Sequence, residues 1–442
     1  MNIDFIIDSI KSRVEEKAIV SDGKEYTFGD IYSEYIRACE ILGREGITSG
    51  STVTLAGEFS PESVAFLLAL ISRDSIIIPV SMAVKNVDSY NRIAESQHFI
   101  DLREGMKISS SGQEITNPLT RRLISEGHPG LVLFSSGTTG EPKAALHDMT
   151  RLMKKFARPG KRMSSVMFLL FDHIGGFNTL MYSLANGGLM VTLKDRSPEE
   201  VCRLIGKYKV ELLPASPTFL NMLLLSRLYG KYDLSSLRMI TYGTEPMPES
   251  TLKALHGIMP DVRLKQTYGL SELGIMPTKS DSSDSLYLKL GGEGFETKIV
   301  DGILYVRAES AMLGYLNAPS PFDSEGWFNT QDRVEIRNGS IKILGRTTDL
   351  INVGGEKVYP NEVESVLLAM EGVLDVHVYG EDNMLTGKTV TAEIQVSPEN
   401  NTREFVRLLR RYSGEHLEAF KRPVKYRLTD KPLYSSRFKK KR

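Results

Sequence analysis

The sequence predicts an α/β protein in which a large N-terminal domain of mixed and parallel sheets with helices precedes a small α+β C-terminal domain. Strand and helix alternate early in the chain: residues 51–56 and 75–80 read as strands, with a helix over 61–71 between them, as in parallel sheets with helical crossovers. Near the C-terminus, residues 373–428 read as three strands and a long helix. The length of 442 residues is enough for two or three domains.

The composition is that of an ordinary soluble globular protein, with 41% hydrophobic and 25% charged residues. The 55 basic and 55 acidic residues cancel, which argues against nucleic acid as the main partner. Charged residues interrupt the most apolar windows, 64–80 and 165–182, so neither reads as a membrane span. The N-terminus lacks a signal-peptide pattern, and Cys39 and Cys202 give no disulfide framework, so we expect a cytoplasmic protein.

The first part of the chain predicts an amphipathic helix over residues 1–19 and a second helix that runs through Leu42. Thr27 or Asp30 can cap this second helix, because short polar side chains accept hydrogen bonds from the first free N–H groups. The Ser-, Gly-, Asn- and Pro-containing stretch 107–118 predicts an exposed loop.

The middle of the chain continues the alternation. Apolar runs predict strands at 130–134, 166–171, 211–215 and 239–242, and a helix at 218–228. A hairpin is expected at 334–336 and 341–343, turned by Asn338-Gly339. The last part predicts a helix near 361–370, strands at 373–379, 389–396 and 424–428, and a helix over 402–418.

A loop suited to phosphate follows the strand at 130–134. Glycines let backbone N–H groups turn toward an anion, hydroxyls donate hydrogen bonds, and a lysine supplies a point charge. The loop is not a Walker motif, because no Gly-Lys-Ser/Thr stands at the required spacing, and its order disfavours a merely flexible Ser/Gly turn. We expect a phosphate group to be held by Ser135, Ser136, Gly137, Thr138, Thr139, Gly140 and Lys143.

The run Phe-Ser-Ser-Gly-Thr-Thr-Gly-Glu-Pro-Lys, residues 134–143, resembles the phosphate loop of the adenylate-forming superfamily. That superfamily comprises acyl-CoA synthetases, aryl-acid ligases, amino-acid adenylation domains and luciferases. The resemblance extends over nearly the whole chain and implies the adenylate-forming enzyme fold. It also implies a large ATP- and carboxylate-binding domain at 1–346, a small mobile domain at 347–442, and ATP and Mg²⁺ as ligands, with the β- and γ-phosphates of ATP on the loop.

Two further segments are similar to the nucleotide-binding motifs of this superfamily. Gly243-Thr244-Glu245 matches its adenine-facing loop, which is weak evidence outside its context. In Tyr268-Gly269-Leu270-Ser271-Glu272, Tyr268 offers an aromatic face to adenine and Ser271 a hydroxyl to the α-phosphate. The resemblance makes Glu272 the Mg²⁺ ligand, and a hard carboxylate oxygen suits this cation.

The ribose contact is expected at Asp332, where the superfamily has Thr-Gly-Asp and this chain has Thr-Gln-Asp. A carboxylate has two acceptor oxygens for the two ribose hydroxyls. Gln331 replaces the glycine, which puts the tightness of this turn in question. Arg346 looks like the arginine that faces the ribose and phosphate.

The carboxylate substrate is expected beside His173, which matches an aromatic or histidine position of the superfamily. The alternative is a core or helix-capping histidine. Phe171-Asp172 leaves a second reading open, because amino-acid adenylation domains use such an aspartate to bind the substrate ammonium; an aspartate also commonly caps a helix.

The C-terminal part carries the expected moving elements. Gly354-Gly355 resembles the hairpin that lines the pantetheine tunnel, and Thr348 stands where relatives have the interdomain hinge residue, so Asp349 can share that role. Phe438 occupies the position of the catalytic lysine, and Lys439 comes one residue late. We assign Lys439, His173 and Thr138 to catalysis; the alternative for Lys439 is a solvated basic tail.

The expected reaction is ATP-dependent ligation of a small carboxylic acid through an acyl-adenylate, with transfer to the thiol of CoA or of a carrier-protein phosphopantetheine. Two alternatives stay open: an amino-acid adenylating enzyme, and a degenerate homologue that binds an adenylate or a carrier protein without turnover.

Overall fold

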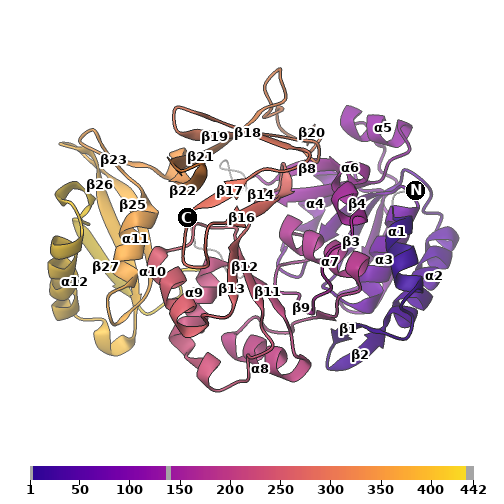
Figure 1. Ribbon diagram of the computed structural model, residues 1–442. Helices are drawn as coiled ribbons and strands as arrows, with labels where there is room; N and C mark the ends of the chain where they lie inside the picture. The colour runs from indigo at the N-terminus through magenta and orange to yellow at the C-terminus, as the bar shows by residue number, and fades with distance from the viewer. Residues whose placement is uncertain (1–2, 136–140, 435–442) are drawn as a thin grey trace.

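The computed structural model describes residues 3–135 and 141–434. Two large sheets with helices form the N-terminal part, a smaller antiparallel sheet lies above them, and a separate α+β unit lies at one side (Figure 1). Within residues 3–135 and 141–434, no helix is both long and apolar enough to cross a membrane.

One large sheet has the strand order β13-β12-β11-β9-β10-β1-β2 and is parallel except for the β1–β2 hairpin. Its strands are β1 (Lys17–Ser21), β2 (Lys24–Thr27), β9 (Ser165–Val166), β10 (Met190–Val191), β11 (Leu212–Ala215), β12 (Met239–Tyr242) and β13 (Arg263–Gln266). Helices α8 (Pro198–Tyr208), α9 (Pro217–Ser226) and α10 (Glu249–Ile258) supply a hydrophobic core with this sheet.

The other large sheet has the order β20-β8-β7-β4-β3-β5-β6. Its strands are β3 (Thr52–Ala56), β4 (Ile76–Val80), β5 (His98–Asp101), β6 (Lys107–Ser110), β7 (Gly130–Ser135), β8 (Lys143–Asp148) and β20 (Gly314–Tyr315). Residues of both sheets share one hydrophobic core with α1 (Asp4–Lys11), α2 (Phe28–Arg44), α3 (Pro61–Ser72) and α7 (Ile174–Asn186). The short helices α4 (Val87–Ile93), α5 (Pro118–Ser125) and α6 (Met149–Met153) complete this part.

The antiparallel sheet has the order β16-β17-β22-β21-β19-β18 and carries the long hairpin of the ribose motif. Its strands are β16 (Thr278–Ser280), β17 (Leu288–Leu290), β18 (Phe295–Val300), β19 (Ile303–Ala308), β21 (Phe328–Arg337) and β22 (Ser340–Arg346). The predicted turn is confirmed: Asn338 and Gly339 both have positive φ, 51° and 76°, as a two-residue hairpin turn requires.

The C-terminal unit has its own hydrophobic core, drawn from residues between Ile351 and Leu428. Its sheet has the order β24-β23-β26-β25, and β27 pairs with β26 in parallel. The elements are β23 (Ile351–Val353), β24 (Glu356–Val358), α11 (Pro360–Leu368), β25 (Val373–Asn383), β26 (Gly387–Val396), α12 (Arg403–His416) and β27 (Lys425–Thr429). The boundary at 346/347 remains a prediction.

Local signals at the N-terminus are confirmed only in part. Thr27 caps α2, and its side chain and that of Asp30 form a reciprocal capping box. The helix predicted over 1–19 is wrong beyond Lys11, because Lys17–Ser21 forms strand β1. This strand is held by parallel pairing with β10, which lies far along the chain and is invisible to local periodicity.

Two other boundaries differ from the prediction. The strand predicted at 166–171 stops after Val166; the residues that follow are buried, except for the partly exposed Leu169, but carry no regular strand pairing. The stretch 107–118 is not all loop, since Lys107–Ser110 forms the edge strand β6 and Pro118 begins α5.

Candidate active site

The predicted phosphate loop joins two paired strands rather than a strand and a helix. Ser135 ends β7 and Lys143 begins β8, and the two residues are register partners in the antiparallel ladder. Ser136, Gly137, Thr138, Thr139 and Gly140 lie outside the described residues. The loop therefore leaves and re-enters the sheet at one point, with Lys143 fixed beside Ser135.

Neighbouring side chains hold both ends of this loop. Tyr90 of α4 stacks on Phe134 at a centroid distance of 3.7 Å. On the other side, Asn317 donates to the carbonyl of Pro142 (2.9 Å) and accepts from the N–H of Ala144 (3.0 Å). Asn317 thus ties the exit of the loop to the segment after β20.

Glu272 of the second motif is placed by contacts from two directions. The hydroxyl of Tyr315 donates a 2.5 Å hydrogen bond to Oε1 of Glu272, and the N–H of Met312 donates to its backbone carbonyl (2.8 Å). One residue earlier, Nε2 of the buried His147 lies 2.6 Å from the carbonyl of Ser271. Burial lowers the pKa of His147, which therefore acts as a neutral donor to this carbonyl.

The hairpin that carries Tyr268 and Gly269 is formed by β14 (Tyr268–Leu270) and β15 (Gly274–Met276). The side chain of Tyr268 is buried in a core cluster, and its hydroxyl donates to Oδ2 of Asp332. The ring therefore lies beside the ribose motif, while stacking on adenine remains a prediction.

Asp332 is turned inward by an irregularity in β21. The segment of β21 from Asn329 to Arg333 pairs with a shorter segment of β19, Ile303 to Tyr305, so β21 bulges. Within the bulge, Gln331 takes the left-handed conformation with φ 59°. A glutamine thus adopts the backbone that the superfamily's glycine favours. The bulge is held by hydrogen bonds from Thr330 to the carbonyl of Leu304 and from Gln331 N–H to Asn329.

Arg346 is the register partner of Asp332 across β21 and β22, and its Nε lies 3.6 Å from Oδ1 of Asp332. Burial raises the pKa of Asp332, although Tyr268 and Arg346 both oppose the shift. Burial also raises the pKa values of Tyr268 and Tyr315, and again Arg346 opposes it. The half-exposed guanidinium therefore acts on three residues that stand far apart in the sequence.

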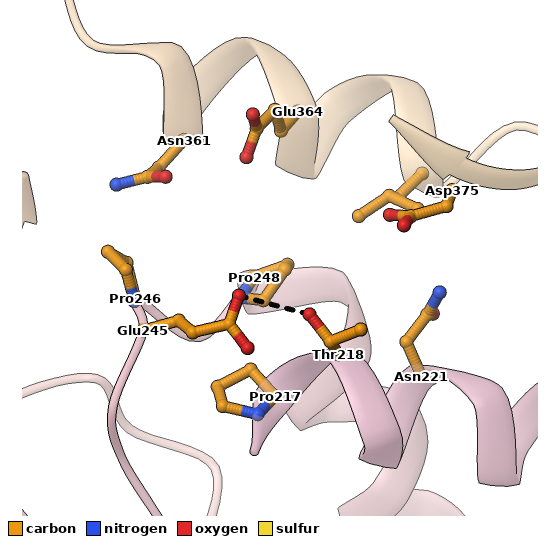
Figure 2. Close-up of a pocket in the computed structure, with 10 residues that line it drawn as sticks. Pro217, Thr218, Asn221, Glu245, Pro246, Pro248, Asn361, Glu364 and Asp375 are labelled. Carbon is orange, nitrogen blue, oxygen red and sulfur yellow. Dashed lines mark hydrogen bonds between the residues drawn. The ribbon is translucent and has the colours of Figure 1, made fainter. Parts of the chain in front are cut away.

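The loop Gly243-Thr244-Glu245 follows β12 and lies against the C-terminal unit. A Cβ at position 243 would meet Oγ1 of Thr267 at 2.5 Å, which explains the glycine. Thr244 has φ 72°, and Glu245 accepts a 3.0 Å hydrogen bond from Thr218. Figure 2 shows this loop facing α11, with Glu245 and Thr218 on one side of a pocket and residues of the C-terminal unit on the other.

Hydrogen bonds connect the C-terminal unit to the large part at this boundary. Ser365 of α11 accepts from the N–H groups of Glu249 (3.1 Å) and Ser250 (3.5 Å), and its carbonyl accepts from the hydroxyl of Ser250 (3.1 Å). Ser365 therefore caps the N-terminus of α10, whose own preceding residue, Pro248, offers no side-chain cap. Asn221 also donates to the carbonyl of Leu374 (2.9 Å).

His173 is the N-cap of α7, where its Nδ1 accepts from the N–H of Gly175 (3.0 Å). The capping alternative is thus observed, yet His173 also lines a pocket together with Phe168, Leu169, Leu170, Arg196, Ser216 and Thr244. The pKa of Glu58 is raised, mainly because Glu58 itself is buried. The negative charge of the nearby, buried Asp172 adds to this rise. The guanidinium of Arg196 lies 3.6 Å from the carboxylate of Glu58, so the protein itself places a positive charge beside these two acidic residues.

Gly354 and Gly355 form the turn between β23 and β24, with φ values of 61° and 96°. A Cβ at position 355 would meet no atom within 4 Å, so this position faces open space, whereas a Cβ at position 354 would touch Thr386 at 3.9 Å. Thr348 and Asp349 lie in a 3₁₀ turn between β22 and β23. Lys439 lies outside the described residues.

A second candidate for a cation is a group formed by Glu126, His128 and Asp148, the one such acid–histidine group found among residues 3–135 and 141–434. Arg122 already pairs with Glu126, and Arg151 with Asp148. Because these arginines already neutralise the carboxylates of Glu126 and Asp148, Glu272 remains the better candidate for a metal ligand.

Residues 85–316 match the family model described as "AMP-binding enzyme". This match covers more than half of the chain.

The chain belongs to the AMP-binding enzyme family.

Curated relatives of this family member are CoA ligases. 4-Coumarate–CoA ligase-like 9 of Arabidopsis thaliana is 27% identical over 442 aligned residues, which cover 87% of this chain and 78% of that protein. Long-chain-fatty-acid–CoA ligase FadD13 of Mycobacterium tuberculosis is 28% identical over 320 residues, 66% of this chain and 62% of that protein. The chain thus spans less than two thirds of the length of FadD13.

Solved structures share the fold across the whole chain. The anthranilate CoA ligase AuaEII in complex with anthranoyl-AMP gives a TM-score of 0.83 at 20% identity, covering 99% of this chain and 95% of that one. The o-succinylbenzoate CoA synthetase of Bacillus subtilis gives a TM-score of 0.77 at 19% identity, covering 99% and 96%. The adenylate-forming enzyme fold is therefore confirmed.

The structure also shows two residues near the site that the sequence interpretation missed. Tyr315 and Asn317 belong to the short segment Gly-Tyr-Leu-Asn around β20, and both contact predicted site residues. Periodicity gave no signal here, because two residues of strand are too short to show a period.

Proposed function

We propose that this chain is an ATP-dependent carboxylate ligase that forms an acyl-adenylate and passes the acyl group to a thiol. The observation that carries the proposal is the meeting of separate motifs at Asp332: Nε of Arg346 lies 3.6 Å from its Oδ1, and the hydroxyl of Tyr268 donates to its Oδ2. A half-exposed guanidinium beside a carboxylate suits a nucleotide phosphate and ribose.

In the first step, an oxygen of the substrate carboxylate attacks the α-phosphorus of ATP, and the bond to the β-phosphate oxygen breaks, releasing pyrophosphate. This chain would contribute position and charge rather than covalent chemistry. Lys143 and Ser135 would hold the terminal phosphates together with the other residues of the loop. Asp332 would accept hydrogen bonds from the ribose hydroxyls, with Arg346 beside it.

Glu272 fits Mg²⁺, because its carboxylate supplies a hard oxygen donor, and Mg²⁺ takes one or two carboxylates together with phosphate oxygens and water. When bound, the metal would offset the negative charge that builds up on the leaving pyrophosphate. The residues of this chain that would present the carboxylate to it are Glu272 and the neighbours that fix its backbone.

In the second step, a thiolate attacks the acyl carbon of the adenylate and AMP leaves. We propose that the C-terminal unit, residues 347–442, turns so that Gly354-Gly355 approaches the acyl carbon, since glycines allow close passage of a thiol arm. The acceptor is CoA or a carrier-protein phosphopantetheine; the names of the curated relatives favour CoA. Free Cys39 and Cys202 agree with a reducing cytoplasm.

The test is ATP–pyrophosphate exchange of the purified protein against a panel of aliphatic, aromatic and amino acids. Exchange with at least one non-amino acid, followed by thioester formation with CoA, is the expected result. Exchange with amino acids alone would overturn the proposal in favour of amino-acid adenylation. ATP binding without exchange for any acid would identify a degenerate homologue.

A further inference from the structure

Tyr315 connects two groups that belong to separate motifs. Its hydroxyl donates to Oε1 of Glu272 at 2.5 Å, and its ring lies 5.3 Å below Nζ of Lys143, measured to the ring centroid. The first partner belongs to the candidate metal site and the second to the phosphate loop. A single side chain thus contacts both.

The backbone makes this position rigid. Tyr315 lies in β20, which pairs with β8, and its register partner Ala145 is two residues from Lys143. The side chain of Tyr315 is buried, at 8% exposure, and the N–H of Leu316 donates to the carbonyl of Ala144 (2.9 Å). The pairing of β20 with β8 and the burial of the side chain therefore set the position of the ring.

A carboxylate binds a cation more tightly when its orientation is fixed in advance. A hydrogen bond to one carboxylate oxygen fixes the rotamer and leaves the other oxygen for the metal. The Tyr315 hydroxyl occupies one oxygen of Glu272 in this way. Its ring face, which is negative, attracts the ammonium of Lys143 and limits where that charge can lie.

We propose that Tyr315 is a positioning residue that presents Glu272 to the divalent cation and Lys143 to the phosphates of the same nucleotide. This inference rests on the proposed function, and it concerns a residue that is neither a ligand of the metal nor part of the phosphate loop. Its two parts separate cleanly: the hydroxyl acts on the metal and the ring acts on the lysine.

The experiment measures Mn²⁺ binding by the electron paramagnetic resonance signal of the free ion, with a non-hydrolysable ATP analogue present at saturation. Tyr315→Phe keeps the ring and loses the hydroxyl, so we expect the Mn²⁺ dissociation constant to rise about tenfold. The affinity for the analogue without metal should stay within about twofold. Tyr315→Leu removes the ring as well and should weaken both.

Tyr287→Phe is the matched control, because the Tyr287 hydroxyl also donates to a glutamate, Glu335, at the exposed surface. It should leave Mn²⁺ binding unchanged. In a Glu272→Gln background, Tyr315→Phe should add no further loss, since the two residues act as one unit.

Mn²⁺ affinity of Tyr315→Phe equal to that of Tyr287→Phe would overturn the proposal, as would an equal loss of analogue binding with and without metal. Wild-type protein that binds the analogue without any Mn²⁺ dependence would overturn it too. The expected metal response in a protein that catalyses no pyrophosphate exchange would contradict the proposed function alone.

Discussion

The hydroxyl of Tyr268 donates a 2.5 Å hydrogen bond to Oδ2 of Asp332, which stands 64 residues later in the sequence. The other oxygen of Asp332 faces Arg346 at 3.6 Å. Each carboxylate oxygen has a second lone pair, so Asp332 can accept from ribose hydroxyls while it keeps both protein contacts. The carboxylate of Asp332, the candidate ribose contact, is therefore held in place by the protein's own side chains.

We predict that Asp332→Asn weakens ATP binding by about 1–3 kcal/mol, because an amide offers one acceptor oxygen where the carboxylate offers two. Calorimetric titration with ATP measures the loss. Tyr268→Phe, which removes only the donor to Asp332, should weaken binding less. Unchanged affinity in folded Asp332→Asn protein would remove Asp332 from the site.

The same substitution should not destabilise the free protein at neutral pH. Burial raises the folded-state pKa of Asp332 above its unfolded value, so the stabilising protonated form is lost as pH rises through the folded pKa. The neutral asparagine avoids this loss. Thermal unfolding of the ligand-free variant and wild type, compared at pH values below and above the unfolded aspartate pKa of about 4, should show the variant's stability relative to wild type rising with pH.

We predict that Gly355→Trp spares adenylation and blocks thioester formation. Position 355 faces open space here, and a bulky side chain would obstruct the thiol only after the C-terminal unit turns. Because φ of Gly355 is 96°, the adenylation rate also reports whether the strained variant is folded. Gly230→Trp, at another open position, is the control; equal loss in both half-reactions would contradict the tunnel assignment.

We predict that Ser365→Ala slows adenylation by roughly three- to tenfold and leaves thioester formation from a supplied acyl-adenylate unaffected. The substitution leaves the N–H groups of Glu249 and Ser250 without their cap, a loss of about 0.5–1.5 kcal/mol for each hydrogen bond. Separate assays of the two half-reactions check this. A proportional loss in both would mean that Ser365 stabilises the fold alone.

We predict that Lys155 makes stability depend on pH in the alkaline range. Its ammonium contacts Oδ1 of Asn178 (2.6 Å) and the carbonyl of Ile275 (3.2 Å), and burial lowers its pKa to about 8. Since the folded pKa lies below the unfolded value, wild-type protein should gain stability relative to Lys155→Met as pH rises past 8. Chemical unfolding at pH 7 and pH 9.5 should show a relative gain of about 2 kcal/mol; a constant difference would contradict the prediction.

We predict that Lys439→Ala lowers the rate of ATP–pyrophosphate exchange about 10²-fold or more, since a cation between the carboxylate and the α-phosphate offsets their repulsion in the transition state. Thioester formation from a supplied adenylate should persist, and Lys441→Ala should affect neither reaction. Removal of residues 439–442 without effect on exchange would show that the tail is only a solvated run of charge.

The sequence by itself determined the local features of this protein. The capping box of Thr27 and Asp30 and the Asn338-Gly339 turn were predictable, because each depends on side chains and backbone within four residues. The order of the nucleotide motifs was readable in the same way, and it sufficed to identify the family and the fold.

Only the tertiary structure decided which distant residues meet. Lys17–Ser21 is a strand because β10 pairs with it, and Tyr315 joins Glu272 to Lys143 because β20 pairs with β8. Gln331 takes a left-handed backbone because the bulge opposite Leu304 holds it. Residues far apart in the sequence supply the interactions that stabilise these conformations. A local sequence pattern therefore cannot predict them.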